Sequence, residues 1–461
     1  MWLMSTAVTL RKMNVHTRFR NWTVELIEAL QAVNLNLKQW VPVGLLAVYL
    51  VFLCYYALSN PLYTWDTVPY IASMFADEIS SLELLHSTTY SYLEEHLAPE
   101  QFSALISGSY ASDMFANAEH FNSQLNMYAI KPAYIIILKS LTFFGIDPLT
   151  ALALLSLIPG VLICVLLFHW LSSDGGRFQA LLLVLVFSVS ARLIDLSRVP
   201  VPDNFSALVT MAGLYALIAK QWFKIAVTLL CLSVLIRTNN ILFVGLLFCW
   251  QSWVSYRLES SWKGKDFLIF GIGFVMSALV YFVISNSFDY QWWRLFYHTF
   301  IESQVDIDAF SEPFATSLYL PVVQSALLNV LASGAFIATS LPFYLLLFFI
   351  VMGGKWQSLF VESINPPRLV SLGHIAALCL PVFGVFLLFF PLAIGWDRFF
   401  LPYYGLILIF AVKNSRMSKL GSHSLWKKRR NSFLWFPFNV GFLFRGFLEK
   451  RSLMLARSHF D

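Results

Sequence analysis

The stretch of sequence that decides the fold is TALALLSLIPGVLICVLLFHW, which runs from Thr150 to Trp170 without a single Lys, Arg, Asp or Glu. An α-helix rises 1.5 Å per residue, so about 20 apolar residues cross the hydrocarbon core of a bilayer. The stretch has that length and that composition. It therefore predicts a transmembrane helix, and the same pattern recurs along the chain.

Composition extends this prediction to the whole chain. Of the 461 residues, 58% are hydrophobic and 12% are charged, and the mean hydropathy is +0.68. Soluble domains carry about 25% charged residues, so a soluble enzyme, a disordered scaffold and a secreted disulfide domain are excluded. The five cysteines fall in apolar runs without metal-ligand spacing, and we expect them to be packing residues.

Nine further apolar segments predict an all-α, polytopic membrane protein with about ten transmembrane helices, in a range of roughly nine to twelve. These segments are residues 41–58, 179–196, 205–219, 225–235, 241–254, 267–284, 322–352, 369–391 and 399–412. Four regions follow from this layout. They are a cytosolic arm (1–40), a first transmembrane module (41–258) with a long outer loop (59–148), a second transmembrane module (259–412) and a basic tail with an interfacial helix (413–461).

The distribution of charge predicts the sidedness of the chain. Residues 129–144 have a suitable length for a span but contain Lys131 and Lys139, so we expect a helix that lies on the membrane. With the N-terminus in the cytosol, the inner loops and the tail then hold 24 of the 31 basic and 8 of the 26 acidic residues. This is the positive-inside pattern. It predicts that both termini are cytosolic and that the long loop is extracytoplasmic and contains juxtamembrane helices.

Four charged residues are predicted to lie at membrane boundaries on the outer face, namely Asp66, Asp203, Arg237 and Arg398. Charges at such boundaries are costly unless they are paired or used in function. The two aspartates could each supply a general base or a ligand for a divalent metal ion. The two arginines, together with Lys131, have the charge and the donor geometry to bind a phosphate.

Purely structural roles also stay open for these residues. Asp203 follows Pro202 at the expected start of a helix, where Asp is a favourable N-cap, and Asp66 could cap a helix in the same way. The arginines could extend to the headgroups or form ion pairs, and Lys131 could anchor its helix among the headgroups.

The order of the motifs along the outer face gives a family resemblance. The set is Asp66 with Tyr70 four residues on, Lys131-Pro132 with Phe144-Gly145, Arg198 with Pro202-Asp203, the turn Arg237-Thr238-Asn239, and Arg398-Phe399-Phe400-Leu401-Pro402-Tyr403. Over residues 41–412 this set resembles the GT-C glycosyltransferases, which use a polyprenyl-phosphate-linked sugar, and within them the protein mannosyltransferase and aminoarabinose transferase branch. One position departs from that branch, because Thr67 follows Asp66 where the branch has Asp-Glu.

The resemblance implies a GT-C-like fold in which residues 41–258 form the catalytic module. It also implies transfer of a sugar from a polyprenyl-phosphate donor to an acceptor hydroxyl on the extracytoplasmic face, with inversion at the anomeric carbon. The implied catalytic residues are Asp66 and Asp203, with Asp66 as the general base. The implied lipid-phosphate-binding residues are Lys131, Arg237 and Arg398.

Further substrate contacts are implied for Tyr70, Arg198, Asn204 and Tyr403. A divalent metal ion held by Asp66 and Asp203 stays open, and no other cofactor is expected. The implied partners are the lipid-linked sugar, a protein, lipid or glycan acceptor outside the cytoplasm, and the bilayer, but not nucleic acid.

Few cysteines and no evident sorting signal favour a bacterial plasma (inner) membrane. Two other functions remain. A lipid or small-molecule transporter or flippase would place ionisable residues near the bilayer midplane, often at broken helices. A non-catalytic GT-C-like membrane protein is the other, and Thr67 beside Asp66 keeps it open.

Overall fold

A computed structural model describes residues 40–259, 261–289, 291–332, 341–352, 372–391 and 396–420. Within these ranges the chain is helical and forms no β-strand. It divides into two units, Met1–Asn414 and Ser415–Asp461, and the following description concerns the first. The predicted arm up to residue 39 and the tail from residue 421 lie outside the described residues.

Five helices in the described part of the chain are long and apolar enough to cross a membrane. They are α3 (Val41–Ser59), α10 (Pro148–Gly175), α15 (Ile241–Glu259), α16 (Lys265–Ser287) and α22 (Leu372–Phe389). Each coincides with one of the predicted apolar segments, so the structure agrees with a membrane-embedded helical protein.

The remaining predicted spans form other helices. These are α11 (Arg177–Ser190), α12 (Leu193–Leu196), α13 (Asp203–Tyr215), α14 (Phe223–Ile236), α18 (Thr316–Ala332), α20 (Leu341–Met352) and α23 (Trp396–Leu420). The segment 179–196 is interrupted because Arg192 has a left-handed backbone, with φ of 53°. The segment 322–352 runs through residues 333–340, which are not among the described ones. The number of about ten spans therefore stays a prediction.

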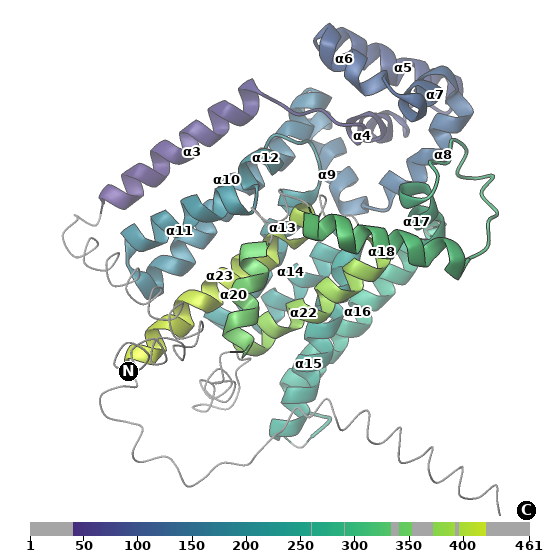
Figure 1. Ribbon diagram of the computed structural model, residues 1–461. Helices are drawn as coiled ribbons and strands as arrows, with labels where there is room; N and C mark the ends of the chain where they lie inside the picture. The colour runs from purple at the N-terminus through teal and green to yellow at the C-terminus, as the bar shows by residue number, and fades with distance from the viewer. Residues whose placement is uncertain are drawn as a thin grey trace, which may run out of the picture. The chain divides into compact units, whose positions relative to one another are not determined.

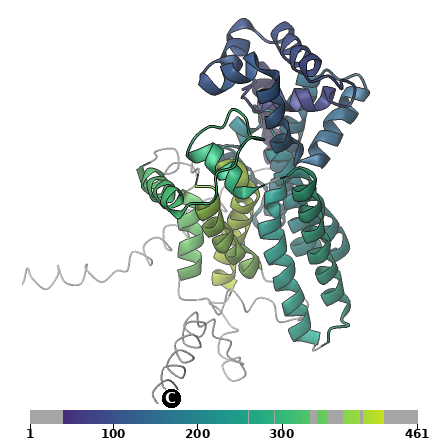
Figure 2. The same ribbon diagram turned by 90° about the vertical axis from the view of Figure 1, so that its right-hand side faces the viewer.

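The long outer loop folds into six helices with a hydrophobic core of their own. They are α4 (Thr67–Phe75), α5 (Leu82–His96), α6 (Pro99–Ile106), α7 (Ser109–Ala116), α8 (Ala118–Ala129) and α9 (Pro132–Phe143). Figures 1 and 2 both show α4 to α8 gathered at one end of the long helices. The 12 residues of α9 span about 18 Å, which is too short to cross the hydrocarbon core.

The long helices pack around a second core. The helix α13 packs against α10 and α14, and α16 packs against α14 and α15. Gly160 in α10 allows a close approach to the chain between α12 and α13, because a Cβ atom there would fall on the side chain of Ser197, just after α12, and lie 3.0 Å from that of Asn204 in α13. Two short segments complete the unit, a π-helical end to α13 (Ala216–Lys220) and a 3₁₀ turn (Thr238–Asn240) between α14 and α15.

Candidate functional site

Five charged residues from five separate helices meet where the outer helices join the long ones. Asp66 immediately precedes α4, Lys131 immediately precedes α9, and Asp203 is the first residue of α13. Arg237 immediately follows α14, and Arg398 lies in the first turn of α23. Helix ends bring their side chains to one end of a helical unit, which is why residues so distant in sequence can converge here.

Arg398 joins the two carboxylates. Its Nε donates to Oδ2 of Asp203 at 3.0 Å, and its Nη2 donates to Oδ2 of Asp66 at 3.0 Å. A planar guanidinium suits this task because its donors point in two fixed directions. The two contacts tie α23 to α4 and α13.

Arg237 completes the environment of Asp203. Its guanidinium forms an ion pair with Oδ1 of Asp203 and lies over the ring of Phe399, 4.2 Å from the ring centre. The side chain of Asp203 is fully buried between the two arginines. A buried carboxylate is stable only when it is paired in this way.

Lys131 and the tyrosines surround Asp66 on its other side. The ammonium of Lys131 donates to the hydroxyl oxygen of Tyr70 and lies 4.9 Å from that ring and 5.2 Å from the ring of Tyr128. The hydroxyl of Tyr128 donates to Oδ1 of Asp66 at 3.2 Å. Asp66 makes no helix-capping hydrogen bond, and Asp203 lies inside α13, so capping explains neither aspartate.

Below about pH 7 the cluster carries more positive than negative charge, because three cations then face two carboxylates. Burial raises the pKa of Asp66, but the charges of Arg398 and Lys131 and the hydrogen bonds from Arg398 and Tyr128 outweigh it and hold that pKa below its usual value. Burial lowers the pKa of Lys131 to about 7; Asp66 opposes this effect, while Arg237 and Arg398 add to it. Such a site favours an added anion.

A divalent metal ion suits these residues poorly. Both carboxylates already bind Arg398, and Lys131 and Arg237 add two further positive charges. Within the described ranges no three His, Cys, Asp or Glu side chains come together as a metal-binding group. A cation would have to displace a guanidinium and then face the remaining ones.

The structure brings six of the nine predicted site residues together, gives Arg198 and Asn204 separate surroundings, and places Tyr403 near enough to Arg237 for the two to interact electrostatically. Arg198 donates to the backbone oxygen of Asn60 and lies over the ring of Tyr56. Asn204 is buried and donates to Ser156 and Ser197, which fastens α13 to α10. Tyr403 is buried, with its ring against Phe243. Arg198 and Asn204 thus connect neighbouring segments through hydrogen bonds that lie apart from the charged cluster.

Three residues add to the sequence-based prediction. Thr67, which follows Asp66 in the sequence, is fully buried, so this position faces the core and not the solvent. Tyr128 and Phe399 contact the cluster but were not predicted to do so. The only sequence signal for either was its place near Lys131 or Arg398, which any interfacial aromatic residue would share.

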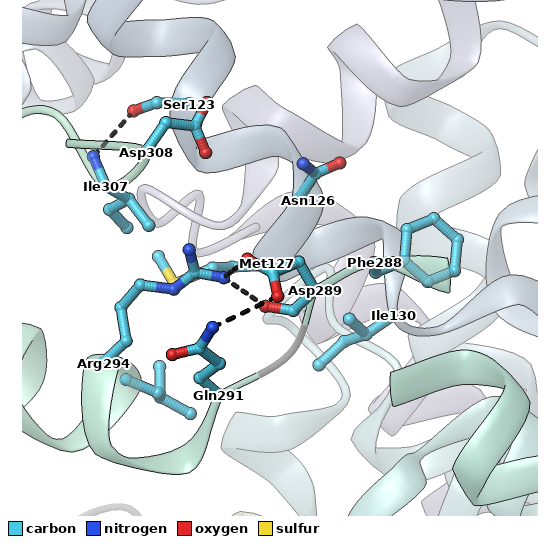
Figure 3. Close-up of a pocket in the computed structure, with 11 residues that line it drawn as sticks. Ser123, Asn126, Met127, Ile130, Phe288, Asp289, Gln291, Arg294, Ile307 and Asp308 are labelled. Atoms are coloured by element: carbon cyan, nitrogen blue, oxygen red, sulfur yellow. Dashed lines mark hydrogen bonds and ion pairs between the residues drawn. The ribbon is translucent and has the colours of Figure 1, made fainter. Parts of the chain in front are cut away.

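The segment that follows α16, residues 288–315, is fastened to α8. Figure 3 shows the crevice between them, in which the backbone N–H of Ile307 donates to Oγ of Ser123 at 3.1 Å. Arg294, on the short helix α17 (Trp292–Phe300), forms an ion pair with Asp289 at 3.0 Å in the same crevice. These polar groups already have partners, so the crevice is a contact between loops that supports α8.

The candidate site thus consists of Asp66, Asp203, Arg237, Arg398 and Lys131, with Tyr70, Tyr128 and Phe399 around them. Its geometry offers a partly exposed carboxylate beside a group of cations. Comparison of the chain with protein-family models, with curated proteins and with solved structures finds no match.

Proposed function

We propose that this protein is a membrane glycosyltransferase that moves a sugar from a polyprenyl-phosphate donor to an acceptor hydroxyl on the extracytoplasmic face, with inversion at the anomeric carbon. The proposal includes a GT-C-like fold with about ten spans, cytosolic termini and a bacterial plasma membrane. The protein, lipid or glycan acceptor would approach from the side of the outer helices.

The observation that carries the proposal is the convergence of the five charged residues. Two carboxylates and three cations from positions 66 to 398 meet at one end of the apolar helices. Their surplus of positive charge matches the phosphate of a lipid whose chain lies among those helices. The helix-end placement differs from that of a transporter, whose ionisable residues lie near the bilayer midplane.

The proposed reaction breaks the bond between the anomeric carbon and the phosphate oxygen and forms a bond from that carbon to the acceptor oxygen. The electron pair of the broken bond leaves on the phosphate, whose added charge Lys131, Arg237 and Arg398 stabilise. The proton of the acceptor hydroxyl passes to the carboxylate of Asp66. The lipid phosphate and the glycosylated acceptor are the products.

Exposure separates the roles of the two aspartates. The Asp66 side chain is 24% exposed and can reach an acceptor, whereas that of Asp203 is 0% exposed. Asp66 is therefore the proposed general base. Asp203 is a positioning residue that fixes the two arginines.

Transfer assays on the reconstituted protein test the proposal. The full chain in liposomes is given a set of polyprenyl-phosphate sugars and acceptors, and transfer is measured for wild type, Asp66→Asn and Asp77→Asn. Asp77 is the matched control because it is an exposed aspartate of the same loop that pairs with Lys139 at 2.5 Å. We expect Asp66→Asn to lose about 10²- to 10⁴-fold in rate and Asp77→Asn to keep it.

The possible outcomes separate the hypotheses. Full activity of Asp66→Asn would show that Asp66 is not the base. Absence of transfer by wild type with every donor contradicts the transferase proposal, and movement of the intact donor between leaflets would then favour a flippase. Lys131→Met should lose donor affinity, while Lys139→Met, its counterpart eight residues on, should not.

A further inference from the structure

Tyr134 is a buried tyrosine beside the charged cluster to which no role has been assigned so far. It lies in the first turn of α9, three residues after Lys131, and its side chain is 0% exposed. Its ring packs edge-on against Tyr70, with ring centres 5.1 Å apart and an interplanar angle of 70°. Tyr70 in turn accepts the hydrogen bond from Lys131.

The hydroxyl of Tyr134 is not explained by packing. It is buried and has no hydrogen-bond partner among the described residues. Buried tyrosines usually find a partner for this group, and leaving it without one costs stability. A phenylalanine would give the same ring contact without that cost, so packing alone favours Phe at this position.

The surroundings of this hydroxyl distinguish it from other buried tyrosines. The charges of Asp66 and Arg398 both act on Tyr134. Tyr90 also has a buried hydroxyl without a described partner, but it packs among the rings of His86, Phe115 and Phe121. Of Tyr90 and Tyr134, therefore, only Tyr134 has a hydroxyl without a partner beside the cluster of cations.

We infer that Tyr134 is a further substrate-binding residue, whose hydroxyl donates to a phosphate oxygen of the ligand that Lys131 binds. The inference rests on the proposed function. A phosphate oxygen accepts hydrogen bonds without donating them, so it suits a hydroxyl that lacks an acceptor. Because Tyr134 is buried, the phosphate reaches it only when neighbouring side chains move, and the flexible side chain of Lys131, which contacts Tyr70, is able to do so.

Ligand-induced shifts of the melting temperature test this inference. The full chain in detergent is titrated with a short polyprenyl monophosphate in one series and with inorganic phosphate in another. The variants are Tyr134→Phe, Tyr90→Phe as the matched control, and Lys131→Met. Both Phe variants should fold and keep or raise the melting temperature without ligand, because each removes a hydroxyl that lacks a partner.

We expect Tyr134→Phe to bind the polyprenyl phosphate about tenfold more weakly or worse, as for loss of one hydrogen bond to a charged group. Tyr90→Phe should bind it like wild type. The same pattern with inorganic phosphate would support the role of Tyr134 and locate the affinity in the phosphate group. If only the polyprenyl phosphate raises the melting temperature, and Tyr134→Phe weakens its binding, the result would support the role of Tyr134 and show that the lipid chain contributes to affinity.

Wild-type affinity in Tyr134→Phe, with affinity lost in Lys131→Met, would overturn the inference alone. Wild-type affinity in Lys131→Met would overturn the proposed phosphate site itself. An equal loss of affinity in Tyr90→Phe and Tyr134→Phe would also overturn the inference, because the effect would then be general to the outer helices.

Discussion

Arg398 is the residue on which the geometry of the candidate site depends most. One guanidinium holds Asp203 through Nε and Asp66 through Nη2, each at 3.0 Å. An ammonium has a single nitrogen and cannot reproduce two contacts in fixed directions. We predict that Arg398→Lys lowers the transfer rate at least about tenfold while the protein still elutes as a folded species. Arg192→Lys, at a half-exposed pair with Asp195, is the control and should keep its rate.

Asp203 gives a prediction about stability. Asn in its place would leave Arg237 and Arg398 facing a neutral group in a buried position. Removing one partner of a buried ion pair costs about 3–5 kcal/mol. We expect Asp203→Asn to lose about that much free energy of unfolding, measured with denaturant in micelles. Asp195→Asn removes a carboxylate that is 43% exposed and pairs with Arg192 and Arg198, so it should cost less than about 1 kcal/mol. Equal losses of unfolding free energy in Asp203→Asn and Asp195→Asn would contradict the prediction.

Lys131 gives a prediction about pH. With its pKa lowered to about 7 by burial and by the neighbouring arginines, against the opposing charge of Asp66, the side chain loses its proton as pH rises through 7. Affinity for a polyprenyl phosphate, whose second ionisation lies near pH 6, should then fall by up to about tenfold per pH unit above 7. Lys131→Arg stays charged and should flatten this dependence. A flat wild-type titration between pH 7 and 9 would refute the prediction.

The lowered pKa of Lys131 also determines the direction in which the free energy of unfolding changes with pH. Unfolding returns Lys131 toward its ordinary pKa of 10.5, so the unfolded chain binds one more proton between about pH 7 and 10.5. The contribution of this group to stability therefore rises with pH in that window. The tyrosines Tyr70 and Tyr128 stay protonated there because burial, with the charge of Asp66, raises the pKa of each hydroxyl well above its usual value.

At the residue scale the sequence predicts candidates but not their partners. The scarcity of charge singled out Asp66, Asp203, Arg237 and Arg398, and the alternation of spans put them on one face. The pairing of Asp66 with Arg398, 332 positions apart, depends on how helices pack, and no local pattern contains that information. Arg198 and Asn204 could not be separated from the site residues by type, because the polar groups of helix packing and of binding are the same.

At the scale of elements, the close approach of α10 to Ser197, at the end of α12, depends on one glycine. A Cβ at Gly160 would fall on the hydroxyl of Ser197, which cannot simply rotate away because it donates to Leu193 and accepts from Asn204. We predict that Gly160→Ala destabilises the protein by about 1–3 kcal/mol, as overpacked cores do. Gly271→Ala in α16, with open space around it, should be neutral or stabilise slightly. Thermal unfolding of the two variants decides between these outcomes.

Long uncharged runs were predicted well as elements, and the shorter runs at 205–219 and 225–235 also form helices, although not ones long enough to count as spans. The five long apolar helices follow from length and composition alone, since lipid leaves few other choices for the backbone. The break at Arg192 and the π-helical end of α13 fall within apolar runs that carry no sequence signal for them. Of the six helices of the outer loop, which pack on one another, only α9 corresponds to a helix predicted at particular residues, 129–144.

At the scale of the molecule, the proposed sidedness can be tested directly. Single cysteines at Glu100 and at Lys263, both exposed, would be introduced into a chain whose native cysteines are replaced. We predict that an impermeant maleimide labels Glu100→Cys in intact cells but reaches Lys263→Cys only after permeabilisation. Labelling of both residues in intact cells, or of Lys263→Cys alone, would contradict the predicted topology.

The ion cluster also has a consequence for biosynthesis. A chain made from its N-terminus inserts α4 and α13 long before Arg398 leaves the ribosome, so Asp66 and Asp203 wait for their shared partner until the last described helix is in place. Until then α23 does not link α4 to α13. A chain that stops before α23 would hold Asp203 through Arg237 alone and Asp66 through Tyr128 and Lys131 without a guanidinium, which is an incomplete site for cellular quality control to detect.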